Sequence, residues 1–277
     1  MRIGLVAPSC TLDASIPDRL RAIAPEHEFV VHPQCFLSEG HFAGPDQARE
    51  DALVEQANDP SIDAIWFAKG GYGACRIAES AIARMGEAAR TKRYLGYSDA
   101  GFLLGGLYAR GIGQVAHGPM PSGLHRADGA ASILRGLDWL VTGQVDAIAD
   151  EGGGMLNLSP PLFGGRHKQV AFNLTVFSQL LGTRLEPDLT DHILMLEDVA
   201  EYMYRLDRSL FHITSSVAVR RVAGIKLGRC SEIPDNDPPF AQTEEEITQH
   251  WCAKSGIAYL GRADIGHDGE NKVVPFG

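Results

Sequence analysis

Long apolar runs, close cysteine pairs and clusters of basic residues are all missing from this sequence. No segment approaches the ~20 consecutive apolar residues of a membrane-spanning helix, and the apolar start, residues 1–8, is too short for a secretory signal peptide. The five cysteines form no CxxC pair and no Cys/His spacing typical of zinc. We therefore expect a cytoplasmic protein in a reducing compartment, with no metal and no membrane partner.

The charge balance excludes a further class of partner. Lys and Arg number 25 against 35 Asp and Glu, for a formal net charge of -10, and no basic run occurs. Nucleic-acid binding depends on clustered Lys and Arg, so we expect no nucleic-acid partner. The sequence also lacks a G-x-x-x-x-G-K-[ST] phosphate loop and an H-E-x-x-H zinc motif. We therefore predict no cofactor.

Short apolar strands and amphipathic helices alternate along the first half of the chain. Hydrophobic residues make up 44% of the 277 and charged residues 22%, which is an ordinary globular balance. Strands are predicted at 2–7, 27–32, 64–68 and 93–96. Helices are predicted at 45–57, 74–85, 100–109 and 129–141. This alternation indicates an α/β fold of βαβ units with a largely parallel sheet.

Glycine and proline pairs interrupt this pattern between about 142 and 169. We therefore predict an N-terminal domain over 1–145, a linker over 146–169 and a smaller C-terminal α/β domain over 170–277. In the second domain, helices are predicted at 173–181, 201–213 and 244–255. Strands are predicted there at 192–196 and 224–227, and the tail runs through 258–260 and 272–274.

Ser98 stands at the corner where the predicted strand 93–96 turns into a helix. The first N–H groups of a helix have no partner inside it, so they can stabilise an oxyanion beside the serine, with the N–H of Asp99 nearest. Ser98 is therefore a candidate nucleophile. The alternative is a helix N-cap. The segment also departs from the G-x-S-x-G elbow, because Ala100 replaces its last glycine.

Three glycines surround Tyr72 directly after a predicted strand: Gly70, Gly71 and Gly73. Glycines let a backbone approach a ligand closely and direct N–H groups towards it. Ligands bind at the carboxyl ends of strands in open parallel sheets, so this loop and Ser98 should share one edge. A second oxyanion donor from Gly70 or Gly71 fits this edge. The alternatives are a plain tight turn, or a dinucleotide loop with Arg76 at its third glycine position.

An acid and a histidine in the second half could complete a hydrolytic site. Glu197 ends an apolar strand, and His267 follows a glycine near the C-terminus. A hydroxyl nucleophile needs a neutral base near pH 7, and the histidine needs a carboxylate on its other nitrogen. The alternatives are a surface acid and an ordinary loop histidine. Glu201 competes with Glu197, and His117 could line a cleft or simply turn the chain.

Eight short stretches occur in one order along nearly the whole chain. They are Ala7-Pro8-Ser9, Lys69 to Gly73, Gly96 to Asp99, His117-Gly118-Pro119, Leu196 to Val199, Tyr204 to Arg208, Gly266-His267 and Pro275-Phe276-Gly277. The ordered set resembles the LD-carboxypeptidase family, serine peptidase family S66, which also contains the microcin C self-immunity peptidases. Any one stretch is common, whereas the set is specific.

The resemblance implies a catalytic triad made of Ser98, Glu197 and His267. It implies an oxyanion hole from the N–H groups of Asp99 and Gly71, with Gly70 as the other possible donor. We expect the substrate cleft to be lined by Gly70, Tyr72 and His117. The resemblance further implies a flavodoxin-like N-terminal domain, a C-terminal domain with its own sheet, and a homodimer. The implied substrate is a cytoplasmic murein tetrapeptide, which loses its terminal D-Ala during wall recycling.

One stretch departs from the family pattern. Relatives usually carry Gly-Gly-Asn-Leu where this chain has Ala171-Phe172-Asn173-Leu174, and we expect the added side chains to narrow the cleft. Three alternative functions stay open. They are an S66 peptidase that cleaves a peptidyl- or aminoacyl-nucleotide, a non-catalytic binder of a small ligand, and an α/β-hydrolase esterase with a single sheet.

Overall fold

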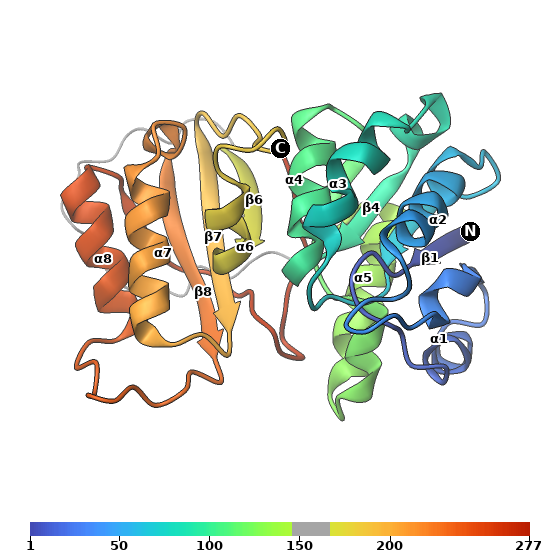
Figure 1. The fold of residues 1–277 in the computed structure, drawn as a ribbon, viewed down its shortest axis with the longest axis horizontal. Coiled ribbons are helices and arrows are strands. Elements are labelled where there is room, and N and C mark those ends of the chain that lie inside the picture. The colour runs from blue at the N-terminus through green and yellow to red at the C-terminus, as the bar shows by residue number, and fades with distance from the viewer. Residues whose placement is uncertain (146–166) are drawn as a thin grey trace.

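The computed structural model describes residues 1–145 and 167–277, which form two α/β units side by side (Figure 1). The first sheet comprises β1 (Arg2–Val6), β2 (Glu28–Val31), β3 (Ala64–Phe67), β4 (Arg93–Gly96), β5 (Gln114–His117) and β10 (Val274–Pro275). Strands β1 to β5 are parallel in the spatial order 2-1-3-4-5, which is the flavodoxin-like order that was predicted. Strand β10 pairs antiparallel with β5.

Helices cover both faces of the first sheet. One face carries α2 (Asp46–Asn58), α3 (Ala74–Ala83) and α4 (Gly101–Ala109), and the other carries α1 (Ile16–Ile23) and α5 (Gly129–Thr142). Successive side chains of a strand point to opposite faces. Ile65 and Phe67 of β3 therefore pack in the first core, while Ala64 and Trp66 pack in the second. Burial on both sides explains why β3 is apolar throughout.

The second sheet comprises β6 (Lys168–Asn173), β7 (His192–Val199), β8 (Gly224–Ser231) and β9 (Tyr259–Arg262). Its strands are parallel and lie in sequence order. One face packs against α6 (Leu174–Leu180), α7 (Met203–Ser215) and α8 (Glu244–Ser255) (Figure 1). A capping box of Thr243 and Glu246 begins α8, and Gly256 ends it in the left-handed conformation. The predicted second sheet is thus confirmed.

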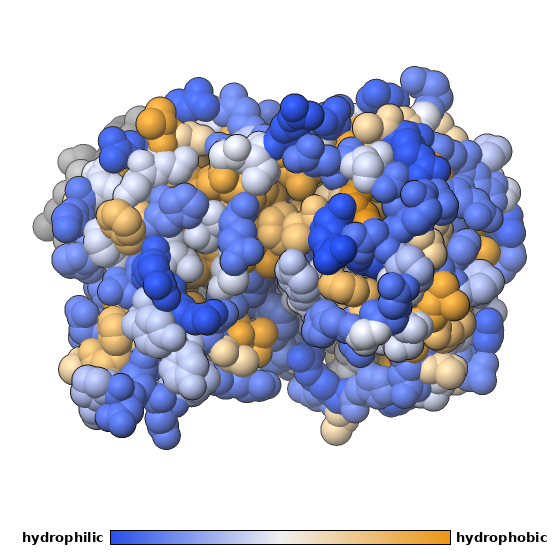
Figure 2. Space-filling view, viewed as in Figure 1, coloured by the Kyte–Doolittle hydropathy of each residue, from blue (hydrophilic) through white to orange (hydrophobic). Residues whose placement is uncertain are grey.

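The two units share one continuous apolar core, and apolar side chains are visible along their junction in Figure 2. Helix α4 packs there through glycines. A Cβ on Gly105 would lie 2.6 Å from Leu180, and a Cβ on Gly106 would lie 2.6 Å from Leu185. The C-terminal tail joins both sheets, since Phe276 N–H donates to Val115 and Gly277 N–H donates to Gln169. The junction is therefore packed and hydrogen-bonded.

Several elements differ from the prediction. Helix α1 and strand β5 were not predicted, because α1 has eight residues with an early proline and β5 has four residues with polar ends. Strand β6 begins at Lys168, inside the predicted linker. The rest of that linker, 146–166, lies outside the described residues, so the division into 1–145 and 170–277 stays a prediction. Within the described ranges, no helix has the length and apolar character needed to cross a bilayer.

Candidate active site

Ser98 lies just beyond the carboxyl end of β4, at the start of a 3-10 turn (Ser98–Ala100) that leads into α4. Its φ is 58°, in the left-handed region, which costs a non-glycine residue on the order of 1–3 kcal/mol. The side chain is half-buried, and the N-cap positions of this turn and of α4 are Tyr97 and Ala100 rather than Ser98. This geometry fits a strained nucleophile corner better than it fits the N-cap alternative.

The glycine loop after β3 lies directly against Ser98. A Cβ on Gly70 would lie 2.9 Å from Ser98 Oγ, so only a glycine allows the backbone to pass this close. Gly71 has a φ of 113°, and a Cβ there would collide with Cys10 Sγ. In residues 1–145 and 167–277, the N–H groups of Gly70 and Gly71 have no hydrogen-bond acceptor. Both remain available to a ligand beside Ser98.

The Asp99 side chain points away from the serine. It is 3% exposed and accepts hydrogen bonds from Ser9 Oγ at 2.5 Å and from the Ala74 N–H, at the start of α3, at 2.8 Å. Burial raises the pKa of Asp99, and these two hydrogen bonds offset part of the rise. The carboxylate therefore joins the ends of β1, β3 and β4. The group of Asp99 that is left to donate a hydrogen bond to an oxyanion is its main-chain N–H.

Glu197 and His267 form a buried pair from the second unit. His267 Nδ1 lies 2.5 Å from Glu197 Oε2, and the Glu197 side chain has no solvent exposure. Burial disfavours the imidazolium, but the charge and hydrogen bond of Glu197 outweigh it and raise the pKa of His267 above its ordinary 6.5. The acid thus fixes the proton on Nδ1 and stabilises the protonated ring.

The other nitrogen of His267 is left without a partner. Nε2 is buried and makes no hydrogen bond within the described part of the chain. The imidazole lies against the Tyr97 ring, with 4.6 Å between ring centroids, and Tyr97 immediately precedes Ser98. The structure thus brings the Glu197–His267 pair beside the Ser98 corner. No hydrogen bond joins His267 to Ser98 among the described residues.

Local backbone geometry places Glu197, rather than Asp198 or Glu201, against His267. Register shifts between Leu196 and Asp198 of β7 where that strand pairs with β8, so Glu197 lies at a bulge. A Cβ on Gly228 would lie 2.8 Å from Glu197 Cβ, so a larger residue at position 228 would clash with the acid. Asp198 instead accepts hydrogen bonds from the start of α6, and Glu201 pairs with Arg205 at 3.5 Å. Neither competes for His267.

The two remaining cleft candidates lie apart. Tyr72 is 49% exposed and packs at the rim near the rings of His41 and Phe42. His117 is 1% exposed and lies edge-on to Tyr97, at 5.7 Å between centroids. Burial, with the charge of His267 acting in the same direction, lowers the pKa of His117 to about 3. His117 is therefore a neutral support behind Tyr97.

A cation that acts on the site, Arg126, is not among the residues predicted from the sequence. Arg126 is exposed and lies two positions before Asp128. Asp128 in turn contacts Gly269, in the loop that carries His267. Burial raises the pKa of Tyr97, and the positive charge of Arg126 offsets part of that rise. The same charge disfavours protonation of His267 and so acts to lower its pKa. Nothing in the local sequence marks Arg126, because its relevance comes from a contact between distant loops.

The departure at Ala171-Phe172 does not narrow the cleft as expected. Phe172 is 1% exposed and packs against Phe177 and Phe276, with ring centroids 5.0 and 5.1 Å away. Asn173 caps α6, since its side chain accepts from the Val176 N–H. These side chains fill the junction core. Across the described ranges, no group of three His, Cys, Asp or Glu residues could hold a metal ion.

Comparisons with known proteins agree with this geometry. The family model for the LD-carboxypeptidase N-terminal domain matches residues 3–118, and the model for the C-terminal domain matches 168–277. A carboxypeptidase-named protein of Synechocystis sp. is 34% identical over 86% of this chain and 75% of that protein. The murein tetrapeptide carboxypeptidase of Pseudomonas aeruginosa is 26% identical over 100% and 91% of the respective chains.

Solved structures share the fold over the whole length. The muramoyltetrapeptide carboxypeptidase from Oxalobacter formigenes has a TM-score of 0.82 and 21% identity, covering 100% of this chain and 93% of that one. The self-immunity protein MccF in complex with glutamyl sulfamoyl guanosine has a TM-score of 0.74 and 17% identity, covering 99% and 95%.

Proposed function

Since the chain belongs to the LD-carboxypeptidase family and is a serine-type hydrolase, we propose that it removes the terminal D-Ala from cytoplasmic murein tetrapeptides. The observation that carries the proposal is the buried Glu197–His267 pair, which lies beside the strained corner at Ser98. The murein tetrapeptide name of a relative aligned over the whole chain supports the substrate.

The proposed reaction proceeds through an acyl-enzyme. Ser98 Oγ attacks the carbonyl carbon that precedes the terminal D-residue, and His267 Nε2 takes the hydroxyl proton. His267 then gives this proton to the leaving amine as the C–N bond breaks. Water, deprotonated by His267, attacks the ester and restores Ser98. Throughout, Glu197 holds the ring through Nδ1 and stabilises its positive charge.

The developing oxyanion needs donors on the far side of the carbonyl. We assign these to the main-chain N–H of Asp99 and to the N–H of Gly71, with Gly70 as the alternative second donor. The free N–H groups of the glycine loop and the inward anchoring of the Asp99 side chain support this assignment. Removal of one such donor typically costs about 10²–10³ in kcat.

Removal of one terminal residue requires a group that recognises the free carboxylate. In that residue the carboxylate carbon lies only about 2.5 Å from the scissile nitrogen, which His267 must protonate. A cation near His267 is therefore in the right place, and the charge of Arg126 acts on both His267 and Tyr97. We assign Arg126 to the substrate carboxylate.

The test is D-Ala release from a purified murein tetrapeptide. Ser98→Ala should abolish turnover while the fold, measured by thermal unfolding, is kept. Ser80→Ala, at an exposed serine on α3, is the matched control and should retain full activity. Undiminished turnover in Ser98→Ala would refute the assignment of the nucleophile.

The fold shared with MccF favours a second candidate, the cleavage of an aminoacyl-nucleotide. A parallel assay with a glutamyl sulfamoyl nucleoside separates the two, because the murein proposal predicts a much higher kcat/KM for the tetrapeptide. We also propose that the protein is cytoplasmic and forms a homodimer. Light scattering of the purified protein tests the dimer.

A further inference from the structure

His267 lies on a loop that crosses from one sheet to the other. The loop leaves β9 at Arg262 in the second sheet and ends at β10, Val274–Pro275, in the first. Figure 1 shows this red tail running between the two halves of the molecule. The direction of the imidazole therefore depends on how both flanks of one crossing segment are held.

Two acids, one on each side of His267, are held by the second unit. Arg229 of β8 donates from Nε and Nη2 to the two carboxylate oxygens of Asp268, at 2.5 and 2.8 Å, and from Nη1 to Asp264 at 2.5 Å. Such a bidentate pair fixes orientation as well as distance. It sets the positions on both sides of His267.

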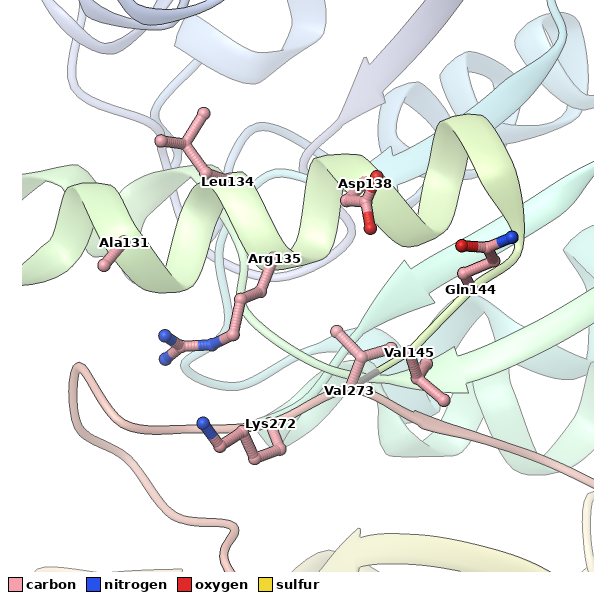
Figure 3. A pocket seen from close by; sticks show the side chains of 8 residues that line it. All are labelled: Ala131, Leu134, Arg135, Asp138, Gln144, Val145, Lys272 and Val273. Carbon is pink, nitrogen blue, oxygen red and sulfur yellow. The ribbon is translucent and has the colours of Figure 1, made fainter. Parts of the chain in front are cut away.

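The downstream flank is held from the other unit. Arg135 of α5 donates from Nη2 to the carbonyl oxygen of Gly269 at 2.5 Å and to that of Asn271 at 3.3 Å. Figure 3 shows the Arg135 side chain reaching from α5 towards the tail at Lys272 and Val273, beside a cavity of about 390 Å³. The Asn271 side chain in turn accepts from the Gly266 N–H at 3.1 Å, which closes the loop around His267.

We propose that Arg135 is a positioning residue that holds the His267 loop against the first unit, so that the imidazole faces Ser98. This inference rests on the proposed function. Ser98 belongs to the first unit and the Glu197–His267 pair to the second, and Arg229 acts entirely within the second. Tyr97 and Asp128 of the unit carrying Ser98 also lie against this segment, and among the described side chains of that unit Arg135 is the one that hydrogen-bonds to its backbone. It sets the alignment between the two halves of the site.

The test compares Arg135→Met and Arg135→Lys with wild type. Arg135→Met should lower kcat for D-Ala release on the order of 10–10²-fold, because small misplacements of catalytic groups have effects of this size. KM should stay within about twofold, because a positioning role assigns Arg135 to the carbonyls of Gly269 and Asn271 and not to the substrate. Arg135→Lys keeps one donor group and the charge, so its kcat should lie between those of wild type and Arg135→Met. Arg90→Met, at an arginine whose nearest acid is Glu87 at 3.6 Å, is the matched control.

A second readout needs no substrate. The imidazole of His267 is titrated by NMR, in surroundings that include Glu197, Asp198, Arg126 and His117. Loss of a nearby cation alone would raise the pKa of His267. A loosened loop would separate the ring from Glu197 and lower it, which is the expected result for Arg135→Met.

The outcomes are distinct. A wild-type kcat together with an unchanged or raised pKa of His267 in a folded Arg135→Met protein would overturn the positioning role. A lower unfolding temperature, with kcat and the pKa of His267 both unchanged, would show that Arg135 only stabilises the fold. That result would also overturn the positioning role. If wild type releases no D-Ala, the proposed function fails, while the His267 titration still decides the role of Arg135. Should Arg135→Met not fold, the same readouts are applied to Arg135→Lys.

Discussion

A single methyl group at Gly70 should separate catalysis from folding. Gly70 is not in the left-handed region, so alanine fits its backbone without strain. The added Cβ would, however, lie 2.9 Å from Ser98 Oγ, 3.0 Å from Ser98 Cβ and 3.2 Å from Met120 Cε. These distances are shorter than ordinary carbon contacts, so either the serine or the glycine loop must move by several tenths of an ångström.

The size of the effect follows from the tolerance of the oxyanion site. Its donors work at about 2.7–3.1 Å from the oxyanion, so a shift of this size weakens one donor and turns the nucleophile. Gly70→Ala should therefore lose about 10²–10³ in kcat, equivalent to about 3–4 kcal/mol of transition-state stabilisation. KM should change little, because the carbonyl is held by these donors mainly in the transition state.

The assay is steady-state release of D-Ala, with thermal unfolding measured on the same samples. Gly86→Ala is the matched control, because a Cβ there meets only Asn58, at 3.5 Å, and its φ is also ordinary. Gly86→Ala should keep wild-type kinetics. A folded Gly70→Ala protein with wild-type kcat would show that this loop takes no part in the reaction.

Three further changes probe the acid, its support and the carboxylate site. Glu197→Gln should lower kcat by up to about 10⁴. Because Glu197 raises the pKa of His267, and the base must be neutral, the acid limb of kcat/KM should move to lower pH in this variant; an unmoved limb would argue against the pair. Gly228→Ala places a Cβ 2.8 Å from Glu197 Cβ and from Ile265 O, and should lower the free energy of unfolding by about 1–3 kcal/mol in urea titrations; unchanged stability would show that the bulge can relax. Arg126→Met should raise KM about tenfold for the free-acid tetrapeptide but not for its C-terminal amide, and equal effects on both would exclude Arg126 from carboxylate recognition.

Much of the fold could be predicted because it depends on local patterns. The buried strand 64–67 is apolar on both faces, and α8 carries both of its caps in the sequence. Ser98 and the glycine loop could be found for the same reason, since carboxyl ends of parallel strands meet at one edge.

The remaining features depend on contacts between distant residues. The φ of Ser98, the bulge at Glu197 and the fit of Gly228 against it have no local signal, because each is imposed by a neighbouring strand or loop. The grip of Arg135 on the histidine loop joins positions more than 130 residues apart. The tail strand β10 was placed in the second domain, because its sequence does not show that it returns to the first sheet.

The proposed reaction depends most directly on a serine whose reactivity is driven by an imidazole from the other half of the chain. A fluorophosphonate that reacts only with activated serines, followed by peptide mass spectrometry, tests this in one measurement. We expect one adduct, at Ser98, which is formed by wild type and lost in His267→Ala. An adduct at another serine, or equal labelling of Ser98 without the histidine, would contradict the account.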